Sequence, residues 1–258
     1  MLMKCLPKNF FQKNKIFIVI IVRLKSRRLK EKAKLSLFGI SLIEIIILRL
    51  LKFFDRKQII ICTTKLQNNN FFKNISLKYK IKLFLGSNMN VFKRIISCQE
   101  KFKFNHFVRI TGDNPLTDIN SLYKLSLKHI KNNNDYTFTK SISIGLRSEI
   151  ISIKALRRAH KLAVDPNSSE YMSYFFQNKF FKYENVKFKN FIPLEEKYSI
   201  TIDYLKDFFL LKKIITKKKD IYLSRKKIVH RLRKFSKKIN ILDNFSLKNS
   251  KYDVRLKI

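Results

Sequence analysis

A short loop after the first apolar run gathers residue types that bind phosphate. The run at 16–22 is followed by Arg23, Ser26, Arg28 and Lys32. Three cations and a hydroxyl on one loop can hold a triphosphate, because charge-assisted hydrogen bonds to phosphate oxygens are strong. A solvated basic loop is the alternative interpretation, since 57 Lys and Arg residues against 18 Asp and Glu residues give the chain a formal net charge of +39.

Two aspartates each follow an expected strand, in a chain where acidic residues are rare. Asp113 comes after the apolar run at 107–110, and Asp203 after the run at 198–202. Two carboxylates at one edge of a sheet can hold Mg²⁺, which takes oxygen ligands and bridges to substrate phosphates. The alternative is that Asp113 forms a turn or a helix cap and that Asp203 caps the following helix.

The spacing of apolar residues predicts the elements that must position these side chains. Strands are expected at 16–22, 58–62, 81–85, 107–110, 135–138, 149–153 and 198–202. Helices are expected at 41–54, 70–79, 89–102, 118–131, 154–164, 168–180, 204–216 and 223–236. This alternation predicts an α/β fold in which a mostly parallel sheet carries helices on both faces. Ligands of such sheets bind beyond the carboxyl ends of the strands, so the loops after the first four strands should gather at one edge.

Length and composition predict one main domain with short appendages. Residues 1–15 are expected to form a polar N-terminal extension, 16–216 the α/β domain, and 217–258 a basic, partly helical segment packed on it. The hydrophobic share of 45% excludes a wholly disordered polyelectrolyte. The run at 16–22 is far shorter than the roughly 20 residues of a membrane span, so a cytoplasmic protein without a membrane anchor is expected.

The cysteines and the net charge say less about function. Cys5, Cys62 and Cys98 form no CxxC pair, which predicts a reducing compartment and neither a disulfide framework nor a zinc site. Lysine is spread along the whole chain beside many Asn, Ile and Phe residues, as an AT-rich coding sequence would produce. We therefore expect no specific nucleic-acid partner, with an RNA-associated role as the alternative.

Six segments in chain order resemble motifs of the bacterial cytidylyltransferases. They lie at 23–32, 38–44, 86–94, 108–116, 145–149 and 199–203. The segment V-R-I-T-G-D-N-P-L at 108–116 is similar to the family pattern R-I-T-G-D-x-P-L. The four glycines of the chain, Gly39, Gly86, Gly112 and Gly145, all fall on glycine positions of these motifs. The closest branch is the spore-coat polysaccharide biosynthesis F-type, which is related to the CMP-sugar-acid synthetases.

The resemblance implies a Rossmann-like three-layer α/β/α fold of the nucleotide-diphospho-sugar transferase type. It implies a nucleotidyltransferase that moves CMP from CTP onto a sugar or sugar acid and releases pyrophosphate. The products would be precursors of surface polysaccharides or other glycoconjugates of the cell envelope. Mg²⁺ is the implied cofactor, CTP and a small sugar are the implied ligands, and a homodimer is left open.

The resemblance also assigns roles to single residues. The implied catalytic residues are Arg23, Lys32 and Asp113. The implied nucleotide-binding residues are Arg23, Ser26, Arg28, Lys32, Thr63, Ser87, Asn90 and Gly112. The implied sugar-binding residues are Gly145, Glu149 and Glu170. The implied metal ligands are Asp113 and Asp203.

Several positions depart from the family pattern. Lys30 and Glu31 replace the proline and glycine of the first loop, and Asn90 and Arg147 replace aspartates. Tyr171 stands where the family has a histidine. These changes keep two alternatives open: a non-catalytic member that acts as a binding or scaffold protein, and a basic RNA-associated protein.

Overall fold

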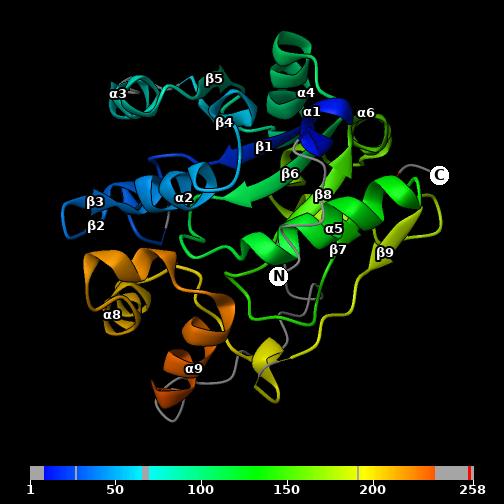
Figure 1. Cartoon of the computed structure of the whole chain (residues 1–258). Helices are drawn as coiled ribbons and strands as arrows, with labels where there is room; N and C mark the ends of the chain where they lie inside the picture. Colours follow the sequence, from blue (N-terminus) through cyan, green and yellow to red (C-terminus); the bar gives the residue numbers. More distant parts are fainter. Residues whose placement is uncertain (1–8, 27, 66–69, 191, 236–254, 257–258) are drawn as a thin grey trace.

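The computed structural model describes residues 9–26, 28–65, 70–190, 192–235 and 255–256, with only the backbone of Ser168 and Glu170 (Figure 1). Within these residues, a seven-stranded sheet has the order β5-β4-β1-β6-β8-β7-β9. β8 runs antiparallel to its two neighbours, and every other pair in this sheet is parallel. The strands are β1 (Ile16–Ile21), β4 (Ile59–Thr64), β5 (Lys82–Gly86), β6 (His106–Thr111), β7 (Tyr136–Phe138), β8 (Glu149–Ser152) and β9 (Tyr183–Asn185).

Helices cover both faces of this sheet, so the expected mostly parallel three-layer α/β/α fold is confirmed (Figure 1). One face carries α1 (Phe10–Lys13), α2 (Leu42–Leu51), α3 (Asn70–Tyr79) and α5 (Ile119–Lys131). The other face carries α4 (Val91–Phe102), α6 (Ile153–Leu162) and α7 (Met172–Phe175). Short 3₁₀ turns are η2 (Lys32–Lys34), η3 (Arg56–Gln58), η4 (Pro166–Tyr171), η5 (Glu195–Lys197) and η6 (Lys218–Tyr222).

The apolar run of β1 reflects burial on both faces. Ile18 and Ile20 pack into the cluster under α2 and α5, while Val19 packs into the cluster under α4 and α6. Successive side chains of a strand point to opposite faces, and here each face is covered by helices. Polar side chains near β1 are therefore expected in the loops at its ends.

A third apolar cluster lies off the sheet and carries the C-terminal part of the described chain. The hairpin of β2 (Ser36–Leu37) and β3 (Ile40–Ser41) packs there with α8 (Leu205–Ile214) and α9 (Arg225–Phe235) (Figure 1). Ile228, Val229 and Leu232 of α9 are fully buried in this cluster. α9, which was expected near 223–236, thus packs with β2, β3 and α8.

The described part of the N-terminal extension also packs on the domain. Phe11 of α1 is buried and makes edge-to-face contacts with Phe54 and Tyr123. Of the described helices, none combines the length and the apolar character that crossing a bilayer requires.

Two expected elements differ from the structure. The helix expected at 168–180 is split into η4 and the four-residue α7, because burial of Phe175 and Phe176 in the sheet cluster bends the chain and the Asn178 side chain caps the Phe175 carbonyl. The strand expected at 198–202 forms only an isolated bridge between Ile144 and Ser199. Its backbone instead bonds to the loops that follow other strands.

Candidate active site

A cavity of about 280 Å³ lies at the carboxyl ends of β1 and β6. These strands are adjacent and parallel, with Ile21 opposite Thr111, and β1 has β4 on its other side. The order of strands reverses at this point, where doubly wound sheets bind their ligands. The cavity is lined by Ile21, Val22, Arg23, Ser26, Arg28, Lys32, Val91, Arg94, Arg109, Thr111, Gly112, Asp113 and Tyr171. The loops after β1 and β6 therefore meet here, as the sequence predicted.

The loop after β1 keeps a tight shape despite its departures from the family pattern. Glu31, at the family's glycine position, has a left-handed φ of 50°, a conformation that favours glycine. Its amide and that of Ser26 both donate to the carbonyl of Leu24, at 3.1 and 3.0 Å. The fully buried Ala33 anchors the following turn. Glu31 thus adopts the backbone conformation that a glycine would adopt there, and the next residue, Lys32, lines the cavity.

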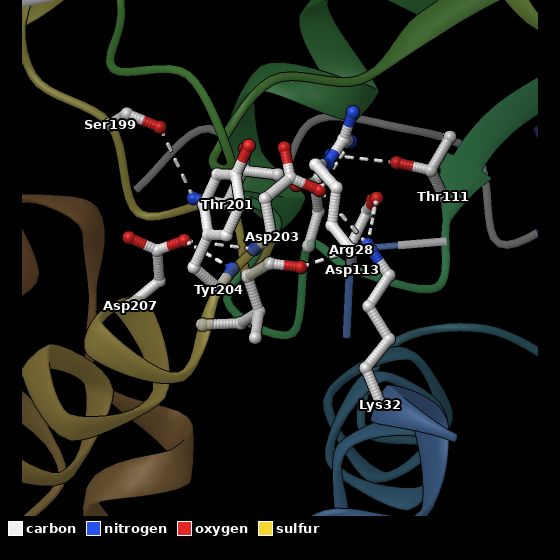
Figure 2. A network of polar contacts seen from close by, with 11 residues as sticks. Arg28, Lys32, Thr111, Asp113, Ser199, Thr201, Asp203, Tyr204 and Asp207 are labelled. Carbon is white, nitrogen blue, oxygen red and sulfur yellow. Dashed lines mark hydrogen bonds and ion pairs between the residues drawn. The ribbon is translucent and has the colours of Figure 1, made fainter. Parts of the chain in front are cut away.

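Lys32 joins the two aspartates that the sequence singled out. Its ammonium donates to Asp113 Oδ2 at 2.9 Å, to Asp203 Oδ1 at 3.1 Å and to the Ile202 carbonyl at 2.8 Å. Arg28 donates to the same Asp203 oxygen at 2.6 Å. Figure 2 shows these four side chains converging from three parts of the chain. The predicted meeting of Asp113 and Asp203 at one place is present in the structure.

The charges of this network shift the pKa of Asp203. Burial alone would raise the pKa of its carboxyl, but hydrogen bonds and charge from Arg28 and Lys32 outweigh burial and hold the pKa below its ordinary value. Burial would likewise lower the pKa of Arg28, but the Asp203 carboxylate raises it. The pair is therefore charged at neutral pH.

Asp203 is positioned by the extended segment that was expected to be a strand. The Ile202 amide donates to the Asp113 carbonyl at 2.9 Å, and the Ile200 amide to the Ile144 carbonyl at 2.9 Å. The amides of Asp203 and Tyr204 both donate to Asp207 Oδ2, at 2.9 and 2.8 Å (Figure 2). These bonds fix the backbone of Asp203 just before α8 begins.

Gly145 gives this segment the room it needs. Its φ is 88°, and a Cβ there would lie 2.6 Å from the Thr201 amide nitrogen and 2.7 Å from the Ile200 carbonyl carbon. Gly112 has a similar effect between the two strands, because a Cβ there would lie 2.4 Å from Val22 Cγ2. The structure thus gives Gly145 a packing role, and Gly112 both lines the cavity and allows the strand ends to approach.

Glu149 lies at the same sheet edge because β8 is antiparallel, which places its first residue beside the last residues of its neighbours. Its carboxylate is buried and accepts hydrogen bonds from Arg109, from the Tyr136 hydroxyl and from Ser173 Oγ, the last at 2.9 Å. Burial and the Glu149 charge raise the pKa of Tyr136 well above its ordinary value. Arg109 is among the described residues that line the cavity and Glu149 is not, so Glu149 contacts a lining residue and not the cavity itself.

The three residues expected to contact the base and ribose do not line the cavity within the described part of the chain. Thr63 is fully buried inside β4 rather than in the following loop. Asn90 caps α4 by accepting from the Lys93 amide at 2.8 Å, and the Ser87 hydroxyl accepts from the Asn90 amide at 3.2 Å. These contacts hold the loop after β5. Arg94, on the helix that follows this loop, lines the cavity.

Arg94 and Arg109 are cavity residues that sequence reasoning missed. Arg94 is buried and donates to the carbonyls of Ser87 (2.8 Å) and Asn88 (3.2 Å), and Gly86 leaves space for its side chain. Both arginines lie inside the segments that resemble family motifs, at 86–94 and 108–116. Their positions within these motifs could therefore have identified them as candidate site residues. Thr111 and Tyr171 were missed as well.

The remaining expected sugar-binding residue is Glu170, and a departure from the family pattern lies at Arg147, in the motif at 145–149. The side chain of Glu170 lies outside the described part of the chain. Arg147, which replaces a family aspartate, donates to the backbone carbonyls of Ile142 (2.6 Å) and Lys140 (3.0 Å) and so braces its own loop.

The oxygens around Lys32 are of the kind that Mg²⁺ binds. Asp113 and Asp203 offer carboxylate oxygens, and both lie within hydrogen-bond distance of one ammonium nitrogen. No group of three or more His, Cys, Asp and Glu side chains suited to a metal occurs in the described residues. Two carboxylates still fit the ion, because Mg²⁺ commonly takes one or two carboxylates and completes its shell with water and phosphate oxygens.

The amino-acid sequence is similar to a known family and to proteins of other organisms. The family described as Cytidylyltransferase matches residues 17–249. An uncharacterized protein of Methanocaldococcus jannaschii is 34% identical over 198 residues, which cover 76% of this chain and 81% of that protein. The spore coat polysaccharide biosynthesis protein SpsF of Bacillus subtilis is 25% identical over 214 residues, which cover 79% of this chain and 88% of that protein.

Solved structures show the same fold. A cytidylyltransferase from Leptospira borgpetersenii superposes with a TM-score of 0.75 at 22% identity, over 90% of this chain and 98% of that one. A CMP:2-keto-3-deoxy-manno-octonic acid synthetase complexed with CTP gives a TM-score of 0.58 at 12% identity, over 78% and 98% of the two chains. The match of the family over nearly the whole chain, together with the shared fold, shows that this protein belongs to the cytidylyltransferase family.

Proposed function

We propose that this protein transfers CMP from CTP to a hydroxyl of a sugar or sugar acid and releases pyrophosphate. The observation that carries the proposal is the cavity at the switch point of the sheet, which is lined by five cationic side chains together with Asp113. A triphosphate carries several negative charges, and a partly enclosed cationic cavity is complementary to it.

In this proposal the phosphate chain lies along the loop after β1. Arg23, Arg28 and Lys32 bind the β- and γ-phosphates, which become the leaving pyrophosphate. The acceptor hydroxyl attacks the α-phosphorus, a new P–O bond forms, and the bond to the β-phosphate oxygen breaks. The hydroxyl proton passes to solvent or to a nearby carboxylate. Positioning and charge neutralisation do most of the work in such reactions.

Asp113 and Asp203 would hold Mg²⁺ in the active complex. When bound there, this ion would neutralise phosphate charge and lower the barrier to attack. Arg109, held by Glu149, would present a fixed positive charge to the acceptor side of the cavity. The retained shape of the loop at Glu31 supports an active enzyme over a non-catalytic relative.

Calorimetric titration of CTP with and without Mg²⁺ tests this proposal. We expect wild-type protein to bind CTP with Mg²⁺, and Arg28→Gln to bind it about tenfold more weakly, a loss of about 1.4 kcal/mol. Lys25→Gln is the matched control, because it removes the same charge from the same loop at an exposed position away from the cavity.

Pyrophosphate release with a panel of sugars and sugar acids then tests the reaction. We expect release with CTP and at least one acceptor, and much less with ATP, GTP or UTP. Absence of CTP binding at millimolar concentration, with Lys25→Gln and wild type alike, would overturn the proposal and favour a binding or scaffold role.

A further inference from the structure

The three donors of the Lys32 ammonium are all used within the protein. They meet Asp113 Oδ2, Asp203 Oδ1 and the Ile202 carbonyl at 2.9, 3.1 and 2.8 Å (Figure 2). An ammonium group has three N–H donors and no acceptor. The side chain is only 13% exposed. A phosphate oxygen that reaches this position therefore finds the ammonium already engaged.

The same carboxylates are held by the cations assigned to the phosphates. Asp203 Oδ1 accepts from both Lys32 and Arg28, and the other oxygen facing Lys32 belongs to Asp113. Two positive and two negative charges thus neutralise one another across the cavity. Arg28 and Lys32, which would bind the triphosphate, therefore form ion pairs with the aspartates that would bind a divalent cation.

We infer that this ion-pair network (Arg28 and Lys32 with Asp113 and Asp203) is autoinhibitory: it opposes the binding of either ligand alone, and each ligand releases the residues that the other needs. A divalent cation on the carboxylates frees Lys32 and Arg28 for phosphate, and phosphate on the cations frees the carboxylates for metal. The inference rests on the proposed function, because it concerns how that site is loaded.

An autoinhibitory network and a simple metal site predict different effects of the aspartate substitutions on the affinity for metal-free CTP. Asp113→Asn and Asp203→Asn remove metal ligands, yet each also removes one of the two negative charges that hold Lys32. We therefore expect both variants to bind metal-free CTP more tightly than wild type does, although they lose the benefit of Mg²⁺. Ligands and competing intramolecular contacts are linked in this way whenever both use the same groups.

The first experiment titrates CTP into each protein in the presence of EDTA. We expect about fivefold tighter binding by Asp113→Asn and Asp203→Asn, or binding that becomes measurable only in these variants. Glu100→Gln is the control for loss of a negative charge, because the exposed Glu100 carboxylate pairs with Arg157 and contacts neither Arg28 nor Lys32 in the described hydrogen bonds and ion pairs. It removes the same charge without releasing Lys32, so we expect a change within about twofold.

The second experiment measures Mn²⁺ alone by the electron paramagnetic resonance signal of the free ion. We expect Lys32→Gln to bind Mn²⁺ about fivefold more tightly than wild type. Lys34→Gln is the control, since Lys34 pairs with Glu31 and not with the aspartates. Thermal denaturation by circular dichroism checks that every variant is folded.

The outcomes separate this inference from the proposed function. If wild type binds CTP with Mg²⁺ but the aspartate variants bind metal-free CTP no better than wild type or Glu100→Gln, the inference is wrong and the function stands. If no protein binds CTP under any condition, the function is wrong, and the Mn²⁺ titration still tests the network. An Mn²⁺ affinity of Lys32→Gln equal to that of wild type would overturn the inference that the network is autoinhibitory.

Discussion

At the scale of single residues, the buried Glu195 has few polar partners among the described residues. Its side chain is fully buried at η5, and its carboxylate oxygens accept no hydrogen bond within the described residues. The nearest cation is Arg225, whose Nε lies 3.7 Å from Oε1. Burial raises the pKa of Glu195 to about 7; Arg225 opposes this shift, and the charges of Asp118 and Glu196 add to it.

This shift makes stability depend on pH in a definite direction. A carboxyl whose folded pKa lies above its unfolded value binds its proton more tightly in the folded state. Its contribution to stability is present in full below the unfolded pKa of 4.5 and is lost as the pH rises through about 7. Glu195→Gln removes this titration while keeping the shape of the side chain.

We expect wild type to lose stability relative to Glu195→Gln by on the order of 2 kcal/mol between about pH 5 and about pH 8. Urea denaturation of both proteins across this range measures the difference. Glu196→Gln, which changes the neighbouring carboxyl that accepts from Asn190, is the control. A difference that does not change with pH would show that Glu195 is ionised throughout.

At the scale of elements, the site depends on contact between loops that are distant in sequence. The segment that ends at Asp203 is held by Ile144 and by the Asp113 carbonyl rather than by a neighbouring strand of the sheet. Gly145 lies against this segment with no room for a Cβ. The position of Asp203 therefore depends on a glycine nearly sixty residues away in sequence.

Gly145→Ala tests this dependence. A Cβ at 145 would meet backbone atoms of Ile200 and Thr201 that cannot move independently, and φ is also positive there. We expect a loss of roughly 3 kcal/mol in the free energy of unfolding and a weaker effect of Mg²⁺ on CTP binding.

Gly39→Ala is the matched control for this variant. Gly39 has a similar positive φ of 72°, but nothing lies within 4 Å of a Cβ built there. We expect only the backbone strain, about 1 kcal/mol, and unchanged CTP binding. Equal losses for the two variants would mean that the contact at Gly145 does not position Asp203.

At the scale of the whole molecule, the chain carries a formal net charge of +39. Like charges repel on folding, and salt screens that repulsion. Basic side chains also gather locally, as in the hollow beside α9 that includes Lys217, Lys219, Lys226 and Lys227. Acidic partners are too few to neutralise them.

We expect the melting temperature to rise by several degrees between about 20 mM and about 500 mM NaCl, because screening lowers the cost of compaction. Differential scanning calorimetry measures the shift, and KCl at equal ionic strength is the control for binding of a specific cation. A melting temperature that falls with salt would indicate that ion pairs such as Arg158–Asp135 outweigh the net repulsion.

Much of the fold was predictable from local pattern. The buried run of β1 and the periodic apolar faces of α4 and α5 lie close to where the sequence placed them. Strands buried on both faces and amphipathic helices carry their signal in a few consecutive residues. The split helix at 168–180 was not predictable in this way, because burial against the sheet decides where it bends.

The sequence by itself determined the fold class, the loop that carries Arg28 and Lys32, and the two aspartates at element ends, because these depend on residue type and on neighbours along the chain. Only the tertiary structure decided that Lys32 lies between Asp113 and Asp203, that Thr63 is buried in β4, and that Arg94 and Arg109 reach the cavity. Such contacts join residues 80 or more positions apart or depend on side-chain direction. The physical reason is that charge pairing and burial act through space, where the order of the strands, and not sequence distance, sets which side chains meet.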